Sequence, residues 1–151
     1  MSVVFVGLGS NLGDRAGFLR RALRELHLVR GLQIQACSRF RRTDPVGGPE
    51  QPDFVNAVVK AETSLRPDRL LQDLLQIEQR HGRRRIEADG PRTLDLDLLL
   101  YGRHRSDTAM LQLPHPRLEQ RRFVLEPLAE LSPRLPLSEG RTPVECLASL
   151  A

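Results

Sequence analysis

Residues 90–101 constrain the fold of this chain more than any other segment, because they combine a strand pattern with two acidic residues. Side chains alternate between the two faces of a β-strand. The alternation predicts one face made of Leu94, Leu96, Leu98 and Leu100, and another made of Asp95, Asp97, Leu99 and Tyr101. Aspartate is depleted in strands and is rarely buried without a partner. Asp95 and Asp97, about 7 Å apart along the strand, therefore either face solvent or hold divalent cations.

Length and charge predict a single domain covering residues 1–151. A chain of 151 residues can bury enough surface for one hydrophobic core without disulfides or a structural metal. Basic residues number 23 and acidic residues 19, and Lys60 is the only lysine. Such a preference for arginine across a whole chain more often reflects coding bias than function. Only clustered arginines, whose planar groups suit phosphate, count as a functional signal.

Cysteine content and hydropathy predict a soluble cytoplasmic protein with no membrane partner. Cys37 and Cys146 are the whole cysteine inventory, and their spacing matches neither a metal site nor a disulfide framework. The apolar run at residues 3–8 is too short for a signal peptide or a membrane span.

The order of the expected elements predicts an α+β fold. Strands are expected at residues 2–8, 32–40, 54–63 and 90–101, with one helix capped by Asp14 and ending near Gly31, and another opened by Pro67 and ended near Gly82. This βαββαβ order is the ferredoxin-like arrangement, an antiparallel sheet with helices on one face. A C-terminal extension follows, with a helix near residues 123–131 and a Pro-rich tail.

The strand at Phe54–Thr63 predicts where a site would form. One of its faces carries Val55, Ala57, Val59 and Ala61, and the other carries Phe54, Asn56, Val58 and Lys60. A ferredoxin-like sheet leaves one face free, and Phe54, Asn56 and the two aspartates are expected to meet there. The segments at residues 41–53 and 82–90 are expected to be functional surface loops.

The residue inventory suits a polyphosphate substrate. Two strand aspartates with bound Mg²⁺ would neutralise and bridge phosphates, and arginines would hold the remaining charge. The available arginines are Arg83, Arg85, Arg92 and Arg121. Because the chain has no G-x-x-x-x-G-K-[ST] motif, bound ATP would depend on metal and guanidinium groups.

Six segments together resemble one enzyme family. They are Gly9-Ser10-Asn11-Leu12, Arg42-Thr43-x-Pro45, Gln51-Pro52-Asp53-Phe54-x-Asn56, Glu78 with the arginine loop, Gly90-Pro91-Arg92-Thr93-Leu94-Asp95-Leu96-Asp97, and Pro114-His115. In this order they are similar to 6-hydroxymethyl-7,8-dihydropterin pyrophosphokinase of folate biosynthesis, over nearly the whole chain up to Pro127. The resemblance implies a monomeric ferredoxin-like enzyme that transfers the β,γ-diphosphate of ATP to the pterin hydroxymethyl group and releases AMP. It also implies two Mg²⁺ ions, held by Asp95 and Asp97.

The resemblance further implies roles for individual residues. Phe54 and Phe123 would stack on the pterin, and Thr43, Val46 and Asn56 would bind its polar edge. Arg83 and Arg92 would serve the transferring phosphates as catalytic residues. The residues expected to bind ATP are Leu71, Glu78, Arg85, Leu98, Gln112, His115 and Arg121. The loops at residues 41–53 and 82–90 would close over both substrates.

Three positions depart from the family pattern. Asp89 stands where many members have an aromatic residue, in a loop that is one residue shorter than in some relatives. Asp44 replaces a common proline, and Pro116 follows His115 where an aromatic residue is frequent. None of the three removes an expected metal ligand.

Several features also have purely structural explanations. Phe123 could be a core residue of an amphipathic helix, Phe54 could simply pack, and His115 between two prolines could be a turn residue. Gly9-Ser10-Asn11 is most simply a strand-to-helix turn. Glu130 is expected to be an ordinary surface residue.

Two other functions fit parts of the sequence. Another two-metal phosphoryl-transfer enzyme or a phosphohydrolase would use the same carboxylates, but would hydrolyse ATP without an acceptor. An RNA-binding ferredoxin-like module would need several aromatic residues on the open sheet face and would tolerate no buried acid pair there. With five Phe, one Tyr and two strand aspartates, the sequence argues against nucleic acid as a partner.

Overall fold

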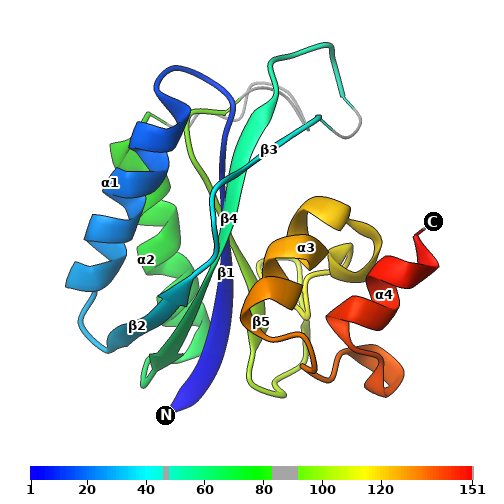
Figure 1. Ribbon diagram of the computed structural model, residues 1–151. Coiled ribbons are helices and arrows are strands. Elements are labelled where there is room, and N and C mark those ends of the chain that lie inside the picture. The colour runs from blue at the N-terminus through cyan, green and yellow to red at the C-terminus, as the bar shows by residue number, and fades with distance from the viewer. Residues whose placement is uncertain (46–47, 83–91, 151) are drawn as a thin grey trace.

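A computed structural model describes residues 1–45, 48–82 and 92–150, and its centre is a five-stranded sheet (Figure 1). The strands are β1 (Ser2–Ser10), β2 (Leu32–Cys37), β3 (Arg41–Thr43), β4 (Phe54–Thr63) and β5 (Asp95–Tyr101). Their order is β2-β4-β1-β5, with β3 also paired to β4, and each of these pairs is antiparallel. The expected strands are therefore present, although β2 ends at Cys37 rather than near residue 40.

Two helices cover one face of the sheet, as the sequence predicts. They are α1 (Arg15–Leu28) and α2 (Pro67–Arg80). Asp14 caps α1 by accepting a hydrogen bond from the Gly17 N–H at 3.1 Å, and Pro67 occupies the first turn of α2, where its missing N–H is not needed. Leu19, Leu26 and Leu74 are completely buried against the sheet in the larger hydrophobic core.

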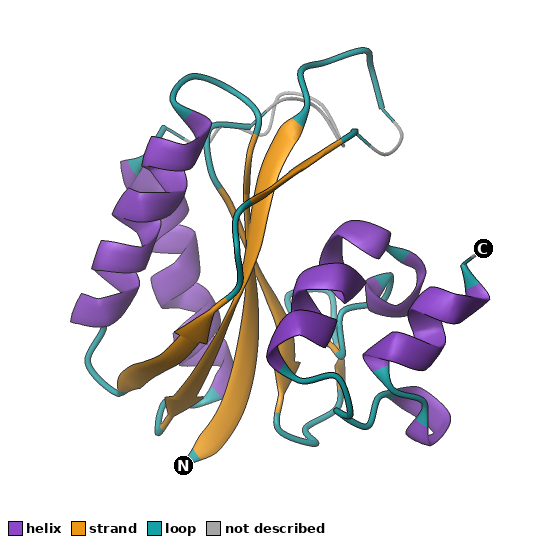
Figure 2. Ribbon diagram, viewed as in Figure 1, coloured by secondary structure: helices purple, strands orange, loops and turns teal. Residues whose placement is uncertain are grey.

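The opposite face is not free, which corrects the prediction of helices on one face alone. Helix α3 (Arg122–Leu131) lies on it and α4 (Pro143–Ser149) packs against α3, so helices flank the sheet on both sides (Figure 2). Leu125 and Leu128 of α3 pack there in a second core with Phe5 and Val58. Apolar side chains of α3 make this cover favourable, because each fully buried leucine contributes about 1.5–3 kcal/mol. The site can therefore use only the part of this face that α3 leaves uncovered.

A β-bulge in β5 interrupts the alternation expected at residues 94–101. Phe5 of β1 pairs with Leu100, whereas the next residue, Val6, pairs with Leu98, so Leu99 is the extra residue. Up to Leu98 the leucines face α1 and α2, as predicted. Beyond the bulge the prediction is wrong: Leu100 joins the second core, and Tyr101 packs against the first, where its hydroxyl donates to the Leu65 carbonyl.

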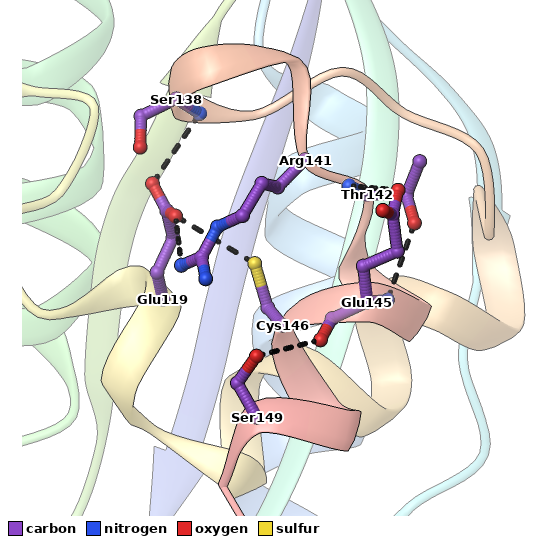
Figure 3. Close-up of polar contacts among 7 residues, drawn as sticks. All are labelled: Glu119, Ser138, Arg141, Thr142, Glu145, Cys146 and Ser149. Atoms are coloured by element: carbon purple, nitrogen blue, oxygen red, sulfur yellow. Dashed lines mark hydrogen bonds and ion pairs between the residues drawn. The ribbon is translucent and has the colours of Figure 1, made fainter.

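The C-terminal segment is folded, although its proline content predicted only a tail. Glu119, in the 3-10 turn Leu118–Gln120, accepts hydrogen bonds from Ser138 N–H at 3.3 Å and from Arg141 Nη2 at 3.0 Å (Figure 3). Thr142 and Glu145 form a reciprocal capping box at the start of α4. The contacts of Glu119 hold the turn Ser138–Gly140 and the start of α4 against the turn Leu118–Gln120.

Two smaller features complete the fold. Residues 41–43, expected in a loop, form strand β3, and a separate hairpin consists of β6 (Ser106–Asp107) and β7 (Gln112–Leu113). Among the described residues, no helix is both long enough and apolar enough to cross a membrane.

Candidate functional site

The main pocket lies on the sheet face that α3 covers only in part. It contains about 680 Å³ of space between atoms, part of it open to solvent. Strands β1, β3, β4 and β5, the segment before β5, and the start of α3 supply its lining: Gly7, Leu8, Gly9, Thr43, Asp44, Gln51, Phe54, Asn56, Ala57, Val58, Arg92, Asp95, Asp97, Leu99, Arg121, Phe123 and Val124.

The two strand aspartates line this pocket together, as their spacing predicts. Arg92 Nη1 lies 3.0 Å from Asp95 Oδ2, so this carboxylate has a cationic partner. Burial raises the pKa of Asp97 to about 8, and the carboxylates of Asp95 and Glu78 add to the shift, while Arg92 and Arg121 oppose it. Burial and the neighbouring carboxylates thus favour the protonated form of Asp97 at neutral pH.

The donor set fits a hard divalent cation. Carboxylate oxygens are the protein ligands that Mg²⁺ prefers, and Mg²⁺ usually takes one or two of them and keeps water and phosphate oxygens as its other ligands. Within residues 1–45, 48–82 and 92–150, no group of three or more His, Cys, Asp or Glu side chains is placed to hold a metal. Asp95 and Asp97 would therefore hold the cation with oxygens of water and substrate, and the cation would relieve the repulsion that raises the pKa of Asp97.

Two aromatic rings with neighbouring guanidinium groups form the less polar part of the pocket. The Arg92 guanidinium lies 5.9 Å from the centre of the Phe54 ring, and that of Arg121 lies 5.4 Å from the centre of the Phe123 ring. Phe54 comes from β4 and Phe123 from α3, so two distant segments supply the rings. Flat faces next to cations suit a heteroaromatic ligand that carries anionic groups.

An amide lies at the base of the pocket. Asn56 is 7% exposed, and its Nδ2 donates a hydrogen bond to Thr43 Oγ1 across the β3–β4 pair. Its oxygen lies over Gly9 of β1, where a Cβ atom would approach Asn56 Oδ1 to 2.7 Å. Only glycine leaves room for the amide at this point, so Gly9 fixes where Asn56 can lie.

Asn11, which the sequence marked only as a turn residue, connects the segments around the pocket. Its Oδ1 accepts from Arg92 N–H at 2.8 Å, and its Nδ2 donates to Gln51 Oε1 and to the Pro52 carbonyl, both at 2.9 Å. The side chain is 1% exposed. The motif Gly9-Ser10-Asn11-Leu12 was the only sign in the sequence that Asn11 matters. Its hydrogen-bond partners could not be predicted, because they lie 40 to 81 residues away in the chain.

The structure brings together most of the residues expected to bind the pterin and the phosphates. The expected residues that line the pocket are Thr43, Phe54, Asn56, Arg92, Asp95, Asp97, Arg121 and Phe123. Val46, Arg83 and Arg85 lie outside the described residues, as do Asp89 and nearly all of the expected loop at residues 82–90.

The other residues expected to bind ATP lie away from this pocket. Leu98 packs in the core beneath α1 and α2, and Glu78 of α2 is 2% exposed and accepts from Leu96 N–H at 2.7 Å. Leu71 is half-buried on α2, and Gln112 is exposed on β7.

His115 lies at the junction between β7 and the turn Leu118–Gln120. Its backbone N–H donates to the carbonyl of Leu99 at 2.9 Å, which ties this junction to the bulge of β5. Burial lowers the pKa of the His115 imidazole, and the positive charge of Arg121 lowers it further. His115 lines another pocket, together with Glu119 and Arg141.

Comparisons with known sequences agree on one family. The model of the 7,8-dihydro-6-hydroxymethylpterin-pyrophosphokinase family matches residues 5–133. The chain is 49% identical over 128 residues to the 2-amino-4-hydroxy-6-hydroxymethyldihydropteridine pyrophosphokinase of Synechocystis sp., which covers 85% of this chain and 65% of that protein. The enzyme of the same name from Bacillus subtilis is 45% identical over 130 residues, 86% of this chain and 78% of that protein. The one from Haemophilus influenzae is 38% identical over 151 residues, all of this chain and 94% of that protein.

Solved structures agree on the fold. The Plasmodium falciparum HPPK-DHPS superposes with a TM-score of 0.70 over 99% of this chain at 14% sequence identity. The match covers 43% of that protein, so the chain corresponds to less than half of its length. At this identity the likeness shows a shared mixed α+β fold with an antiparallel sheet.

Proposed function

This chain belongs to the 7,8-dihydro-6-hydroxymethylpterin-pyrophosphokinase family, and we propose on that premise that it makes the pterin diphosphate of folate biosynthesis. ATP and 6-hydroxymethyl-7,8-dihydropterin are the substrates, and AMP is the second product. The observation that carries the proposal is the meeting of two aspartates, two phenylalanines and a buried amide in one pocket. This combination suits a flat heterocycle bound next to a metal-bound polyphosphate.

Phe54, Phe123, Asn56 and Thr43 bind the pterin in this proposal. The rings of Phe54 and Phe123 stack on the two faces of the heterocycle, and Asn56 reads its polar edge. Support comes from the fixed position of the Asn56 amide between Thr43 and Gly9. Val46, from the adjoining loop, is proposed to contribute a backbone contact.

Asp95 and Asp97 hold two Mg²⁺ ions, and Arg92 and Arg83 bind the transferring phosphates. Mg²⁺ held there would neutralise part of the phosphate charge. Arg92 already lies 3.0 Å from Asp95, a position from which its guanidinium can reach a phosphate bound at that carboxylate. The remaining contacts to ATP are assigned by family resemblance to Leu71, Glu78, Arg85, Leu98, Gln112, His115 and Arg121.

The reaction needs positioning more than covalent help from the protein. The pterin hydroxymethyl oxygen attacks the β-phosphorus, the bond from that phosphorus to the oxygen of the α-phosphate breaks, and the hydroxyl loses its proton. Placing the two substrates in one half-enclosed pocket supplies much of the rate, because the attack becomes effectively intramolecular. Arg92 and Arg121 offset the charge that collects on the phosphates.

The fold and setting of the enzyme complete the proposal. We regard the sheet as a ferredoxin-like βαββαβ unit with β3 inserted, because the strands fall in the order β2-β4-β1-β5 with antiparallel neighbours. Residues 1–151 form one domain, which acts as a monomer. Both cysteines are free thiols, in keeping with a reducing cytoplasm.

Product analysis tests the function directly. The purified chain is incubated with ATP and MgCl₂, with and without 6-hydroxymethyl-7,8-dihydropterin, and the nucleotides are separated. We expect AMP and the pterin diphosphate in equal amounts, and only when the pterin is present. ADP or phosphate released without an acceptor would instead identify a phosphohydrolase. The RNA-binding alternative is disfavoured because α3 covers part of the sheet face that RNA would need.

A further inference from the structure

Glu130, expected to be an ordinary surface residue, joins α3 to the strand that carries Thr43. Its Oε1 lies 2.6 Å from Arg41 Nη2, and its Oε2 accepts from the backbone N–H of Arg39 at 3.0 Å. The side chains of Arg41 and Glu130 are 19% and 29% exposed, whereas that of Arg39 is 79% exposed. The contact to Arg41 is thus the sheltered one, and it is short enough for a charge-assisted hydrogen bond.

The two partners lie on the two elements that form opposite sides of the pocket. Arg41 is two residues before Thr43 on β3, so both side chains point to the same face of the sheet. Arg41 is paired with Asn56 in the β3–β4 register, and Thr43 with Phe54. The strand held by Glu130 is therefore the one that pairs with Phe54 and Asn56, two of the pocket residues of β4.

Glu130 also lies on the helix that supplies Phe123 to the pocket. It follows Phe123 by seven residues on α3, which is two helical turns, so the two side chains lie on the same stripe of the helix. A contact at position 130 sets how closely this stripe approaches β3. That approach in turn sets the space between Phe123 and the residues of β3 and β4.

We propose that the Arg41–Glu130 ion pair is a positioning device that fixes the separation of β3 and α3, and with it the width of the pterin pocket. The proposal rests on the function proposed above. It assigns neither residue to the reaction itself, since neither of them lines the pocket. It predicts that the pair affects binding of the pterin more than binding of ATP, because Arg92, Asp95 and Asp97 lie on β5 and in the segment before it. Arg121, directly before α3, is only one of several proposed contacts to ATP.

The surroundings of Arg41 make this pair more sensitive than an ordinary surface ion pair. Its Nη1 atom is buried and has no hydrogen-bond partner among the described residues. Without the Glu130 carboxylate, the guanidinium would be sheltered from water with its main anion removed, and Arg41 would turn toward solvent. β3 is only three residues long and pairs with β4 alone. Its other side-chain contacts, Thr43 with Asn56 and Arg42 with Asp53, do not reach α3.

The test compares Glu130→Gln, Arg41→Met and the double variant with the wild type. We expect each single variant to raise the Kd for 6-hydroxymethyl-7,8-dihydropterin about tenfold, with the Kd for ATP changed less than about twofold. The double variant should lose no more affinity for the pterin than either single variant, because both substitutions remove the same contact. If the pair had a purely structural role, the substitutions would instead lower thermal stability and weaken the binding of both substrates together.

A matched control lies on the same helix. Glu126 pairs with Arg122 at 3.4 Å, and both side chains are largely exposed, so Glu126→Gln removes a similar charge pair without connecting α3 to β3. This variant should leave the Kd for the pterin unchanged. Equal changes in the Kd for the pterin in Glu126→Gln and Glu130→Gln would overturn the proposal. They would show that the loss of a negative charge on α3 matters, and not the contact between α3 and β3.

Hydrogen exchange separates this inference from the proposed function. In the ligand-free protein, Glu130→Gln should speed amide exchange in β3 at least about tenfold while leaving β1 unchanged. Unchanged exchange in β3 would overturn the inference even if the enzyme is a pterin diphosphokinase. A wild-type chain that binds no pterin would contradict the proposed function, while the exchange result would still decide whether the pair holds the strand.

Discussion

Asn11 and Arg92 are hydrogen-bonded to each other in both directions. The backbone N–H of Asn11 donates to the Arg92 carbonyl at 3.0 Å, and the backbone N–H of Arg92 donates to Asn11 Oδ1 at 2.8 Å. Since the Asn11 side chain also holds Gln51 and Pro52, one buried amide fixes both the segment before β5 and the segment before β4.

Replacing Asn11 by alanine should therefore destabilise the protein and weaken the binding of both substrates. The change leaves buried partners without hydrogen bonds, at a cost of about 2–3 kcal/mol, which corresponds to a fall in Tm of about 4–10 °C. Thermal unfolding followed by circular dichroism measures this. The neighbouring Leu12→Ala, at a position 37% exposed, is the control and should change Tm little. A stable Asn11→Ala variant with normal substrate affinity would contradict the role of Asn11.

Asp95→Asn and Asp97→Asn should each abolish turnover without unfolding the protein. Both remove charge needed to hold Mg²⁺ and keep the size of the side chain, so loss of activity with a native circular dichroism spectrum is expected. Removal of divalent cations with EDTA should have the same effect on the wild type, and added Mg²⁺ should restore its activity. Wild-type turnover in either variant would refute the metal assignment.

Asp97→Asn should also make the metal-free protein more stable, increasingly so as the pH rises. Burial raises the pKa of Asp97 from 3.8 to about 8, so the folded state favours its protonated form. The contribution of Asp97 to the stability of the wild type is therefore fully present below pH 3.8 and is lost progressively as the pH rises to about 8. The difference in Tm between variant and wild type should grow from pH 5 to pH 8. Added Mg²⁺ should reduce it by stabilising the wild type alone. A difference that does not depend on pH would contradict this account.

Asn56→Ala should weaken pterin binding at least about tenfold and leave ATP binding nearly unchanged. Asn56 lies against Thr43 and Gly9 in the pocket, and β1 separates its strand, β4, from β5, which carries the two aspartates. Titration of each substrate followed by calorimetry measures both affinities. Equal losses for the two substrates would show that the amide maintains the pocket rather than recognising the pterin.

Glu119 should stabilise the protein at neutral pH and lose this effect in acid. Burial raises the pKa of Glu119, but hydrogen bonds from Ser138 and Arg141 outweigh it, and the net pKa lies below 4.5. Its contribution is therefore present above pH 4.5 and is lost as the pH falls through the lowered pKa. Thermal unfolding of Glu119→Gln should show a lower Tm at pH 7, and the difference should shrink toward pH 3. Glu139→Gln, in the same segment but exposed, should show no such difference.

The sequence predicted the elements whose signals are local. The alternation over Phe54–Thr63 gave both faces of β4 correctly, and the positions of Asp14 and Pro67 gave the starts of α1 and α2. The same alternation placed Asp95 and Asp97 on one face, which the pocket confirms. Capping and periodicity depend on residues a few positions apart, so a single chain contains all the information they need.

The features that the sequence missed depend on residues far apart in the chain. The bulge at Leu99 is visible only when β5 is aligned with β1, because the residues of β5 alone alternate without interruption. The connections made by Asn11 and Glu130 likewise join residues from distant segments. A glutamate near the end of an amphipathic helix has the same local pattern whether it meets solvent or an arginine of another element.

The position of α3 has a consequence for the synthesis of the protein on the ribosome. The sheet and its first two helices are encoded before residue 102, and together they could bury the larger core during translation. Phe123 and Arg121 close the pocket from a segment translated later. A nascent chain that stops short of these residues would carry the acid pair but only one of the two rings. Catalytic competence should therefore appear abruptly, late in translation, and not in proportion to the length of chain already folded.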